Sequence, residues 1–325
     1  MAAAAPSQLR ILLAGAGAFG QEHLRRLVER PDVRVAAVAD QCSMALDAVR
    51  QRHSSITCFE DPRQMLDQTP ADAVIVATPA ASHAAITLHA IARSLGVLLE
   101  KPVTLGPAEA EGLARAAADA GTLVLPGHVL RFSRDHRKLV EIAASGILGR
   151  VLHVRSRRYR DDAHAVRYRD IDPVLMTMIH DIDIALWIAR SPFRSARAWR
   201  STGGFRSLTA VTAVTESGVI CELQTAWTFT PGEAPPDRVE VVGENGGIEL
   251  DTSHGLVLHA EGRRSLIPLA MDDDALANEQ DHFFACLRDR NQVPALNLRD
   301  AVAGLRLAGA VCGSLRDSRE VRLDV

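Results

Sequence analysis

The sequence predicts an α/β fold at the N-terminus, a Rossmann doubly wound parallel sheet, followed by an α+β domain with a large, mainly antiparallel open sheet. In the first part of the chain, short apolar runs alternate with segments of helical periodicity, as in a parallel sheet covered by helices on both faces. After about Pro126, apolar runs follow one another with turn residues between them, which favours antiparallel pairing. The 325 residues therefore divide into two predicted domains, 1–126 and 127–325.

The predicted strands of the first domain are short and almost wholly apolar. The run at Arg10–Ala14 is closed by glycines, and Leu24, Leu27 and Val28 then have helical spacing, so a strand, a turn and a helix follow in that order. The same alternation then repeats. We expect strands at Val33–Ala39, Ile56–Phe59, Ala73–Thr78, Val97–Glu100 and Thr122–Leu125, and helices at Met44–Arg52, Ser82–Ser94 and Pro107–Ala120.

The second predicted domain begins with a helix near Asp135–Ser145, a strand at Val151–Arg160 and an apolar helix at Val174–Ala189. Turn signals such as Glu244–Gly247 separate the strands that come next. We expect these strands at Leu208–Thr215, Val219–Phe229, Arg238–Val242, Gly247–Asp251, Leu256–His259 and Ser265–Leu269, before closing helices at Ala275–Arg290 and Leu298–Leu315.

The composition excludes several classes of partner. A net charge of −3 supplies no general attraction for nucleic acid or for an anionic membrane, so we expect a small polar molecule as the partner. No apolar stretch reaches the roughly 20 residues that a membrane span needs. Met1–Ser7 lacks the cationic start and apolar core of a signal peptide, which favours a cytoplasmic location. The five cysteines are far apart and form no Cys-x-x-Cys pair, so we expect neither disulfides nor a zinc site.

A glycine motif, Gly15-Ala16-Gly17-Ala18-Phe19-Gly20, follows the first predicted strand and begins a helix. In this context glycines permit a tight turn and a close approach to a pyrophosphate, and the helix N-terminus attracts phosphate charge. Asp40 ends the second strand, where a carboxylate accepts from both ribose hydroxyls and would repel a 2′-phosphate. We expect NAD rather than NADP; the alternative is a glycine turn with an ordinary strand-end aspartate. The expected cofactor contacts are Gly15, Gly17, Ala18, Phe19, Gly20 and Asp40.

Two more polar motifs end predicted strands of the first domain. Thr78-Pro79 ends one, with His83 in the first turn of the next helix, and Glu100-Lys101-Pro102 ends another. Ligands of doubly wound folds lie at this carboxyl edge of the sheet, where Lys101 would face the nicotinamide end of a bound cofactor. Taken singly, the two motifs could also be a proline turn with a solvated histidine and a surface lysine before a proline.

His180 lies in the apolar predicted helix Val174–Ala189, whose ionisable residues are His180, Asp181 and Asp183. Residues at i and i+3 share a helix face, so His180 and Asp183 point the same way. A catalytic histidine and a satisfied core histidine both remain open here. A metal site is not expected, because His-Asp-x-Asp alone supplies too few convergent ligands.

Together these motifs resemble the Gfo/Idh/MocA family of glucose–fructose oxidoreductase and myo-inositol dehydrogenase. The resemblance covers nearly the whole chain. It implies that Thr78, Pro79, His83, Glu100 and Lys101 contact the cofactor, and that Lys101 and His180 are the catalytic residues beside the nicotinamide and the reacting carbinol. The residues that carry it are Gly15–Gly20 with His23, Asp40, Thr78-Pro79 with His83, Glu100-Lys101-Pro102, Gly127–Phe132, Gly146–Gly149, and His180–Asp183 before Trp187.

The sequence departs from the family pattern at Met176, four residues before His180, where many sugar and inositol dehydrogenases carry an aspartate. An apolar residue cannot hydrogen-bond a substrate hydroxyl, so binding free energy must come from elsewhere. Arginine forks suit carboxylate or phosphate, and we expect an anionic group recognised by Arg131 and by arginines between Arg155 and Arg169. The alternative is that these arginines lie on a solvated strand face and loop, with some of them at an oligomer contact. The expected substrate contacts are His128, Arg131, Arg157, Tyr159 and Asp183.

These observations predict an NAD(P)-dependent oxidoreductase that moves a hydride between a nicotinamide and a secondary alcohol of a sugar, cyclitol or anionic sugar derivative. His180 would remove the hydroxyl proton and Lys101 would polarise the same oxygen. Two alternatives stay open: a non-catalytic dinucleotide sensor, and a redox-neutral lyase or hydrolase with tightly bound NAD. We also expect a homo-oligomer, a dimer or tetramer, because few helices remain to cover the large sheet of the second domain.

Overall fold

The computed structural model describes residues 8–203 and 206–323, so the Ala-rich start Met1–Ser7, from which the cytoplasmic location was inferred, lies outside the described residues. The chain forms two compact units. The first comprises the residues up to Gly127 together with Leu276–Ala301, and the second comprises His128–Ala275 and the residues from Val302 onward. Within the described ranges, no helix is both long enough and apolar enough to cross a membrane.

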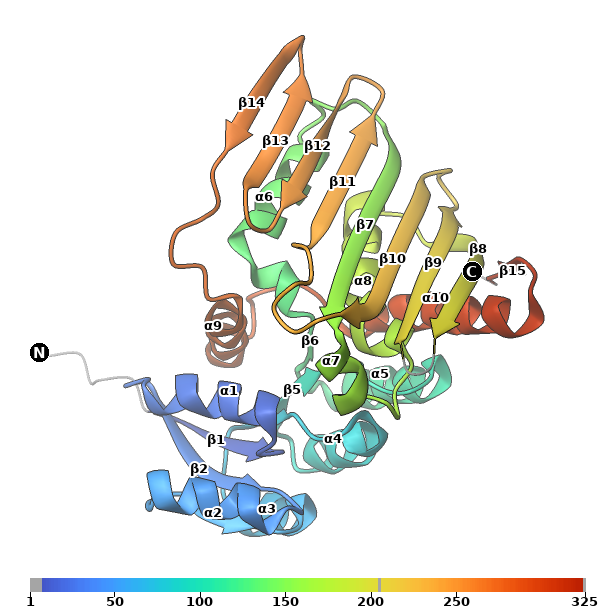
Figure 1. The fold of residues 1–325 in the computed structure, drawn as a ribbon. Helices are drawn as coiled ribbons and strands as arrows, with labels where there is room; N and C mark the ends of the chain where they lie inside the picture. Colours follow the sequence, from blue (N-terminus) through green and yellow to red (C-terminus); the bar gives the residue numbers. More distant parts are fainter. Residues whose placement is uncertain (1–7, 204–205, 324–325) are drawn as a thin grey trace, which may run out of the picture. The chain divides into compact units, whose positions relative to one another are not determined.

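The first unit contains a six-stranded parallel sheet with the order β3-β2-β1-β4-β5-β6, drawn in blue to cyan in Figure 1. The order reverses between β1 and β4, which is where ligands bind in doubly wound sheets. The strands are β1 Leu9–Ala14, β2 Val33–Ala39, β3 Thr57–Phe59, β4 Ala73–Val76, β5 Gly96–Glu100 and β6 Val124–Gly127. The helices are α1 Ala18–Val28, α2 Ser43–Arg52, α3 Pro62–Gln68, η1 Ala80–Ser82, α4 His83–Ala92, α5 Pro107–Ala120 and α9 Ala275–Arg288.

Helix α9 groups with the first unit, although the predicted boundary placed both closing helices in the second domain. Its aromatic residues Phe283 and Phe284 are fully buried, and the Arg30 guanidinium lies 5.0 Å from the Phe284 ring centroid. A Cβ at Gly96 would stand 2.4 Å from Leu287, so α9 approaches β5 closely at this point. The burial of these side chains, which lie far from β5 in the sequence, draws the helix to this unit.

The second unit contains a nine-stranded sheet with the order β14-β13-β12-β11-β7-β10-β9-β8-β15. All pairs are antiparallel except β7 and β10, which run parallel. The predicted fold class is confirmed. The strands are β7 Val151–Asp161, β8 Phe193–Gly203, β9 Arg206–Thr215, β10 Ile220–Phe229, β11 Arg238–Gly243, β12 Gly246–Asp251, β13 Gly255–Ala260, β14 Arg263–Ile267 and β15 Val321–Arg322. The helices are η2 Val129–Phe132, α6 Arg134–Ala144, α7 Asp162–Arg167, the π-helical turn η3 Val174–Met178, α8 Ile179–Ala189 and α10 Leu298–Asp317.

Helices α6 and α8 pack on one face of this sheet and lie behind its strands in Figure 1. Strand β7 shows how side chains are divided between the helix-covered face of the sheet and the opposite face, because side chains alternate between the two faces of a strand. Val154, Ser156 and Arg158 are buried toward the helices, whereas Arg155 and Arg157 point to the opposite face. Alternation along β7 therefore assigns each of its arginines to one of two separate environments.

Candidate active site

The glycine motif forms a turn that only glycine can make at two of its positions. Gly15 has φ +100°, and a Cβ on it would stand 2.5 Å from the Ala77 carbonyl oxygen at the end of β4. A Cβ on Gly20 would stand 2.1 Å from the Gly15 carbonyl oxygen. At Gly17 a Cβ would meet nothing within 4 Å, and no side chain caps the N-terminus of α1 at this residue. This open, uncapped helix N-terminus fits a pyrophosphate.

Asp40 is held beside the glycine turn by backbone hydrogen bonds. The Ala16 N–H donates to Oδ2 at 2.6 Å, and the Cys42 N–H donates to Oδ1 at 2.8 Å. Each carboxylate oxygen keeps a lone pair for a further donor, because one oxygen can accept more than one hydrogen bond. The fixed carboxylate fits the hydroxyls of an adenosine ribose.

His83 connects the turns that follow β4 and β5. Its Nε2 lies 2.7 Å from the Thr78 carbonyl oxygen and its Nδ1 lies 2.9 Å from the Pro102 carbonyl oxygen. The side chain is buried, and burial lowers the pKa of His83 although both carbonyl contacts oppose the shift. Thr78 Oγ1 accepts from Ser82 Oγ at 2.8 Å. His83, one of the expected cofactor contacts, thus forms a buried link between two loops of the carboxyl edge.

Glu100 is directed into the protein and holds the turn that carries Lys101. Its Oε2 accepts from the Lys101 backbone N–H at 3.1 Å, and its Oε1 lies 2.9 Å from His23 Nε2. A Cβ on Gly127 would stand 3.0 Å from the Glu100 Cα, so β6 approaches this turn closely. Lys101 itself is partly exposed. In the first unit the structure brings the glycine turn, Asp40, Thr78 and Lys101 to one edge of one sheet.

In the second unit, the helix residues predicted near the substrate form a buried ion pair. Arg131 donates Nε and Nη2 to the Asp183 carboxylate at 2.9 and 2.8 Å, and His128 Nδ1 lies 3.9 Å from the same carboxylate. The Arg131 guanidinium also lies 5.4 Å from the Trp187 ring centroid. His180 is partly exposed on the same helix, one turn before Asp183. The fork expected to bind an anionic substrate therefore holds a carboxylate of the protein itself.

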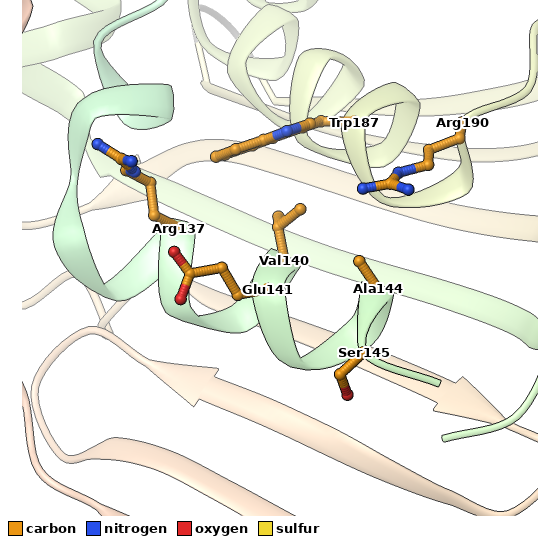
Figure 2. A pocket seen from close by; sticks show the side chains of 7 residues that line it. All are labelled: Arg137, Val140, Glu141, Ala144, Ser145, Trp187 and Arg190. Carbon is orange, nitrogen blue, oxygen red and sulfur yellow. The ribbon is translucent and has the colours of Figure 1, made fainter. Parts of the chain in front are cut away.

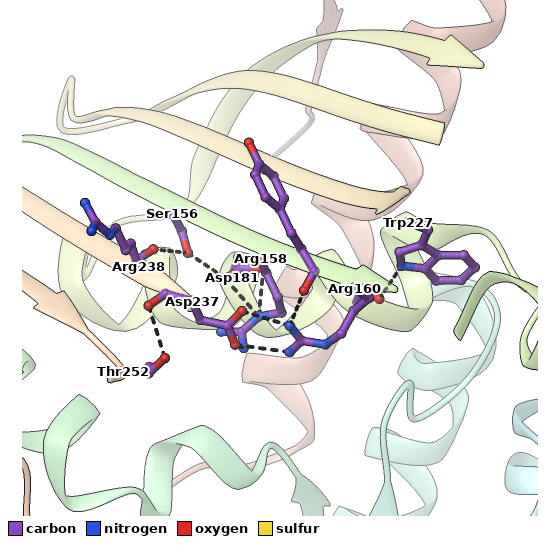
Figure 3. Close-up of polar contacts among 10 residues, drawn as sticks. Ser156, Arg158, Arg160, Asp181, Trp227, Asp237, Arg238 and Thr252 are labelled. Atoms are coloured by element: carbon purple, nitrogen blue, oxygen red, sulfur yellow. Dashed lines mark hydrogen bonds and ion pairs between the residues drawn. The ribbon is translucent and has the colours of Figure 1, made fainter. Parts of the chain in front are cut away.

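Asp181, the next residue after His180, points toward the sheet (Figure 3). It accepts from Ser156 Oγ at 2.5 Å and from Arg158 Nε at 3.2 Å. Arg158 also pairs with Asp237, which accepts from Arg160 at 2.8 Å. Burial raises the pKa of Asp237, but the attraction of both arginines outweighs it and holds that pKa below its ordinary value. These contacts fix α8, and with it His180, against β7.

Two of the expected substrate contacts are not brought together with His180. Arg157 and Tyr159 point to the face of β7 opposite α8, where the Arg157 guanidinium lies 5.2 Å from the Tyr159 ring centroid. Tyr159 donates to Gln224 at 3.0 Å and stacks on Phe229. Their position in the chain was the reason to expect them near the substrate. The alternation of side chains along β7 is the signal that places them on the opposite face from Arg158.

Two cavities in the second unit have no predicted site residue among their lining residues. One, of about 390 Å³, lies between α6 and α8 beside the Trp187 ring, with Arg137 and Arg190 at its two ends (Figure 2). The other, of about 530 Å³, is lined by residues of β8 and α10, including Trp199, Arg197 and Cys312.

Glu279 and Gln280 on α9 are buried near Glu100 and His23, and sequence reasoning missed them because they lie in another part of the chain.

The chain belongs to the Gfo/Idh/MocA oxidoreductase family. Residues 9–128 match the part of the family described as an oxidoreductase with an NAD-binding Rossmann fold, and residues 136–249 match its GFO/IDH/MocA C-terminal domain. The resemblance inferred from the motifs is confirmed. The first unit is accordingly an NAD-binding Rossmann domain.

Several inositol dehydrogenases are similar to this chain. The scyllo-inositol 2-dehydrogenase (NAD(+)) of Bacillus subtilis is 24% identical over 340 residues, which cover 98% of this chain and 97% of the relative. The inositol 2-dehydrogenase 2 of Saccharopolyspora erythraea is 28% identical over 287 residues, or 83% of each chain. The crystal structure of myo-inositol 2-dehydrogenase from Lactobacillus plantarum has a TM-score of 0.86 at 20% identity, covering 98% of this chain and 100% of that one. At that identity the structure shows a shared fold.

Proposed function

We propose that the protein is an NAD-dependent dehydrogenase that oxidises a secondary alcohol of a cyclitol or sugar. The observation that carries this proposal is the uncapped glycine turn with Asp40 fixed beside it, at the same sheet edge as Lys101. The relatives support the reaction class, since the scyllo-inositol dehydrogenase from Lactobacillus casei was solved with bound NAD(H) and scyllo-inositol, with a TM-score of 0.84 to this chain at 18% identity. That structure covers 97% of this chain and 99% of its own.

Each catalytic residue has one role in this proposal. NAD, when bound, accepts the hydride from the carbinol carbon. Lys101 donates a hydrogen bond to the carbinol oxygen, and an imidazole nitrogen of His180 takes the hydroxyl proton. Lys101 and Lys138 are the two lysines of a chain that otherwise uses arginine as its cation. A lysine at position 101 therefore supports a role that requires a compact ammonium group, which the larger, planar guanidinium of arginine could not replace.

The ion pairs that the arginines form within the protein favour a neutral polyol over the anionic substrate expected from the sequence. Arg131, Arg158 and Arg160 all bind carboxylates of the protein, namely Asp183, Asp181 and Asp237. We therefore propose that inositols and neutral sugars are oxidised. The test is NADH formation with inositols, neutral sugars, sugar acids and sugar phosphates. Turnover of acids or phosphates alone would contradict the neutral class, and product formation without net NADH would indicate a redox-neutral reaction.

We expect the protein to bind NAD at least about tenfold more tightly than NADP, because the Asp40 carboxylate would repel the 2′-phosphate. Asp40→Asn removes the charge and keeps an acceptor, so it should reduce this preference by about tenfold. Titration of each cofactor by calorimetry measures the change. Asp47→Asn, an exposed change on α2, is the matched control. Equal affinities of the unsubstituted protein for the two cofactors would refute the expectation.

We expect a homo-oligomer formed through the face of the nine-stranded sheet that lies opposite α8. Pairing registers place four exposed apolar side chains there, Trp199, Leu208, Ile220 and Val242. Burying such a patch against a second copy removes apolar surface from water. Light scattering should show a dimer or tetramer, and Leu208→Glu with Ile220→Glu should release monomer. Met44→Glu, on the exposed surface of the first unit, should not. A monomeric unsubstituted protein at micromolar concentration would contradict the assembly.

A further inference from the structure

Glu279 is a buried carboxyl group to which the proposed reaction gives no role. It lies on α9 and has no exposed surface. Neither of its carboxyl oxygens has a hydrogen-bond partner within the described part of the chain. An ionised carboxylate in such a place would lose its hydration and gain no donor or cation in return. The geometry therefore disfavours the ionised form of Glu279.

A chain of hydrogen bonds connects the same helix to Lys101. Gln280, next to Glu279, donates Nε2 to His23 Nδ1 at 3.0 Å. Because Nδ1 accepts, the neutral His23 ring carries its proton on Nε2, which donates to Glu100 Oε1 at 2.9 Å. The other oxygen of Glu100 accepts from the Lys101 backbone N–H at 3.1 Å. Glu100 thus accepts from two donors, whereas Glu279 accepts from none of the residues that the structure describes.

The two carboxyl groups also sense each other electrostatically. Burial raises the pKa of Glu279 well above its ordinary value, and the charge of Glu100 raises it further. Two like charges in one buried place are disfavoured, so such a pair holds one proton and one negative charge. The donors around Glu100 stabilise the charge there. Glu279, whose oxygens have no such donors among the described residues, retains the proton.

We propose that Glu279 is a positioning residue for Lys101: its protonated carboxyl keeps the pair at a single negative charge, which stays on Glu100 and holds the lysine turn. A second charge would repel the Glu100 carboxylate from His23 and from the Lys101 N–H. The protonation of Glu279 can be tested without cofactor or substrate. The importance of Lys101 rests on the function proposed above.

The first test locates the proton by infrared spectroscopy of the cofactor-free protein at neutral pH. The carbonyl stretch of a protonated carboxylic acid should be present in the unsubstituted protein, absent from Glu279→Gln and retained in Glu100→Gln. Glu109→Gln, on the exposed side of α5, is the matched control and should keep the band. A band that survives in Glu279→Gln, or disappears only in Glu100→Gln, would overturn the proposal.

The second test uses the pH dependence of stability of the same proteins. Above the ordinary pKa of 4.5, the unfolded chain releases the Glu279 proton that the folded chain keeps. The unfolded state then binds fewer protons, so stability falls as pH rises, until the raised folded pKa is reached. The unfolding equilibrium constant of the unsubstituted protein should rise by up to about tenfold per pH unit relative to Glu279→Gln. Curves that stay parallel from about pH 5 to about pH 8 would contradict a buried neutral Glu279.

The third test asks whether this proton matters to Lys101. The ratio of kcat for Glu279→Gln to that of the unsubstituted enzyme should rise at alkaline pH, where Glu279 ionises but glutamine cannot. The same ratio for Glu109→Gln should stay constant. Coincident pH profiles would overturn the positioning role even if the first two tests place the proton on Glu279. If no alcohol is oxidised at all, the proposed function fails, while the infrared and stability results still decide the protonation.

Discussion

Replacing Lys101 with Met, or His180 with Ala, is expected to lower kcat by about 10²- to 10⁴-fold. In the proposed reaction these side chains stabilise charge on the carbinol oxygen and take its proton, and both effects are largest in the transition state. The affinity for NAD should change much less, because in the proposed site the glycine turn and Asp40 would hold the cofactor from other parts of the sheet edge. Steady-state kinetics with the best polyol, together with NAD titration, measure the two effects separately.

Two exposed residues supply matched controls for these substitutions. Lys138→Met removes the other lysine of the chain, whose side chain is 51% exposed on α6. His259→Ala removes an exposed histidine on β13. Both should leave kcat within about twofold of its original value, since surface changes away from a site have small effects. A loss below about tenfold in Lys101→Met or His180→Ala would show that the chemistry lies elsewhere.

Replacing Arg158 with Met is expected to destabilise the protein by about 3–5 kcal/mol, the usual effect of removing one partner of a buried ion pair. Arg158 is buried and bonds both Asp181 and Asp237. Methionine would fill the space but leave the fully buried Asp181 without its cation. Because Asp181 follows His180 on α8, we also expect lower activity in the folded fraction. Urea unfolding gives the stability change.

Arg155→Met is the matched control, since Arg155 lies on the same strand with its side chain exposed on the other face. It should change the free energy of unfolding by less than about 0.5 kcal/mol. A similarly small change in Arg158→Met would mean that the buried arginine and its two carboxylates contribute no net stability. If Arg158→Met destabilises the protein as expected, adding Asp181→Asn should recover part of the lost stability, because it removes the uncompensated charge.

Local patterns in the sequence predicted most of the secondary structure. The strands β1–β7 and β9–β14 lie within a few residues of their predicted places, because alternation and turn residues act over short distances. The long strand β8, at Phe193–Gly203, was not predicted. It carries several arginines and only a few apolar side chains, and its place in the sheet comes from pairing with β9 and β15. Helices α3 and α7 were also missed, since each is too short for a clear periodic signal.

The candidate site also has one part that local sequence patterns predicted and another part that they did not. The sequence by itself determined the glycine turn, Asp40 and Lys101 at a common sheet edge, because the order of strands and turns along the chain carries that information. Only the tertiary structure decided which charges meet. Arg131 binds Asp183 and Glu279 lies near Glu100 because segments far apart in the chain were buried against each other. Burial and pairing depend on distances in space, and these distances determine whether an arginine is available to a ligand and whether a carboxyl group keeps its proton.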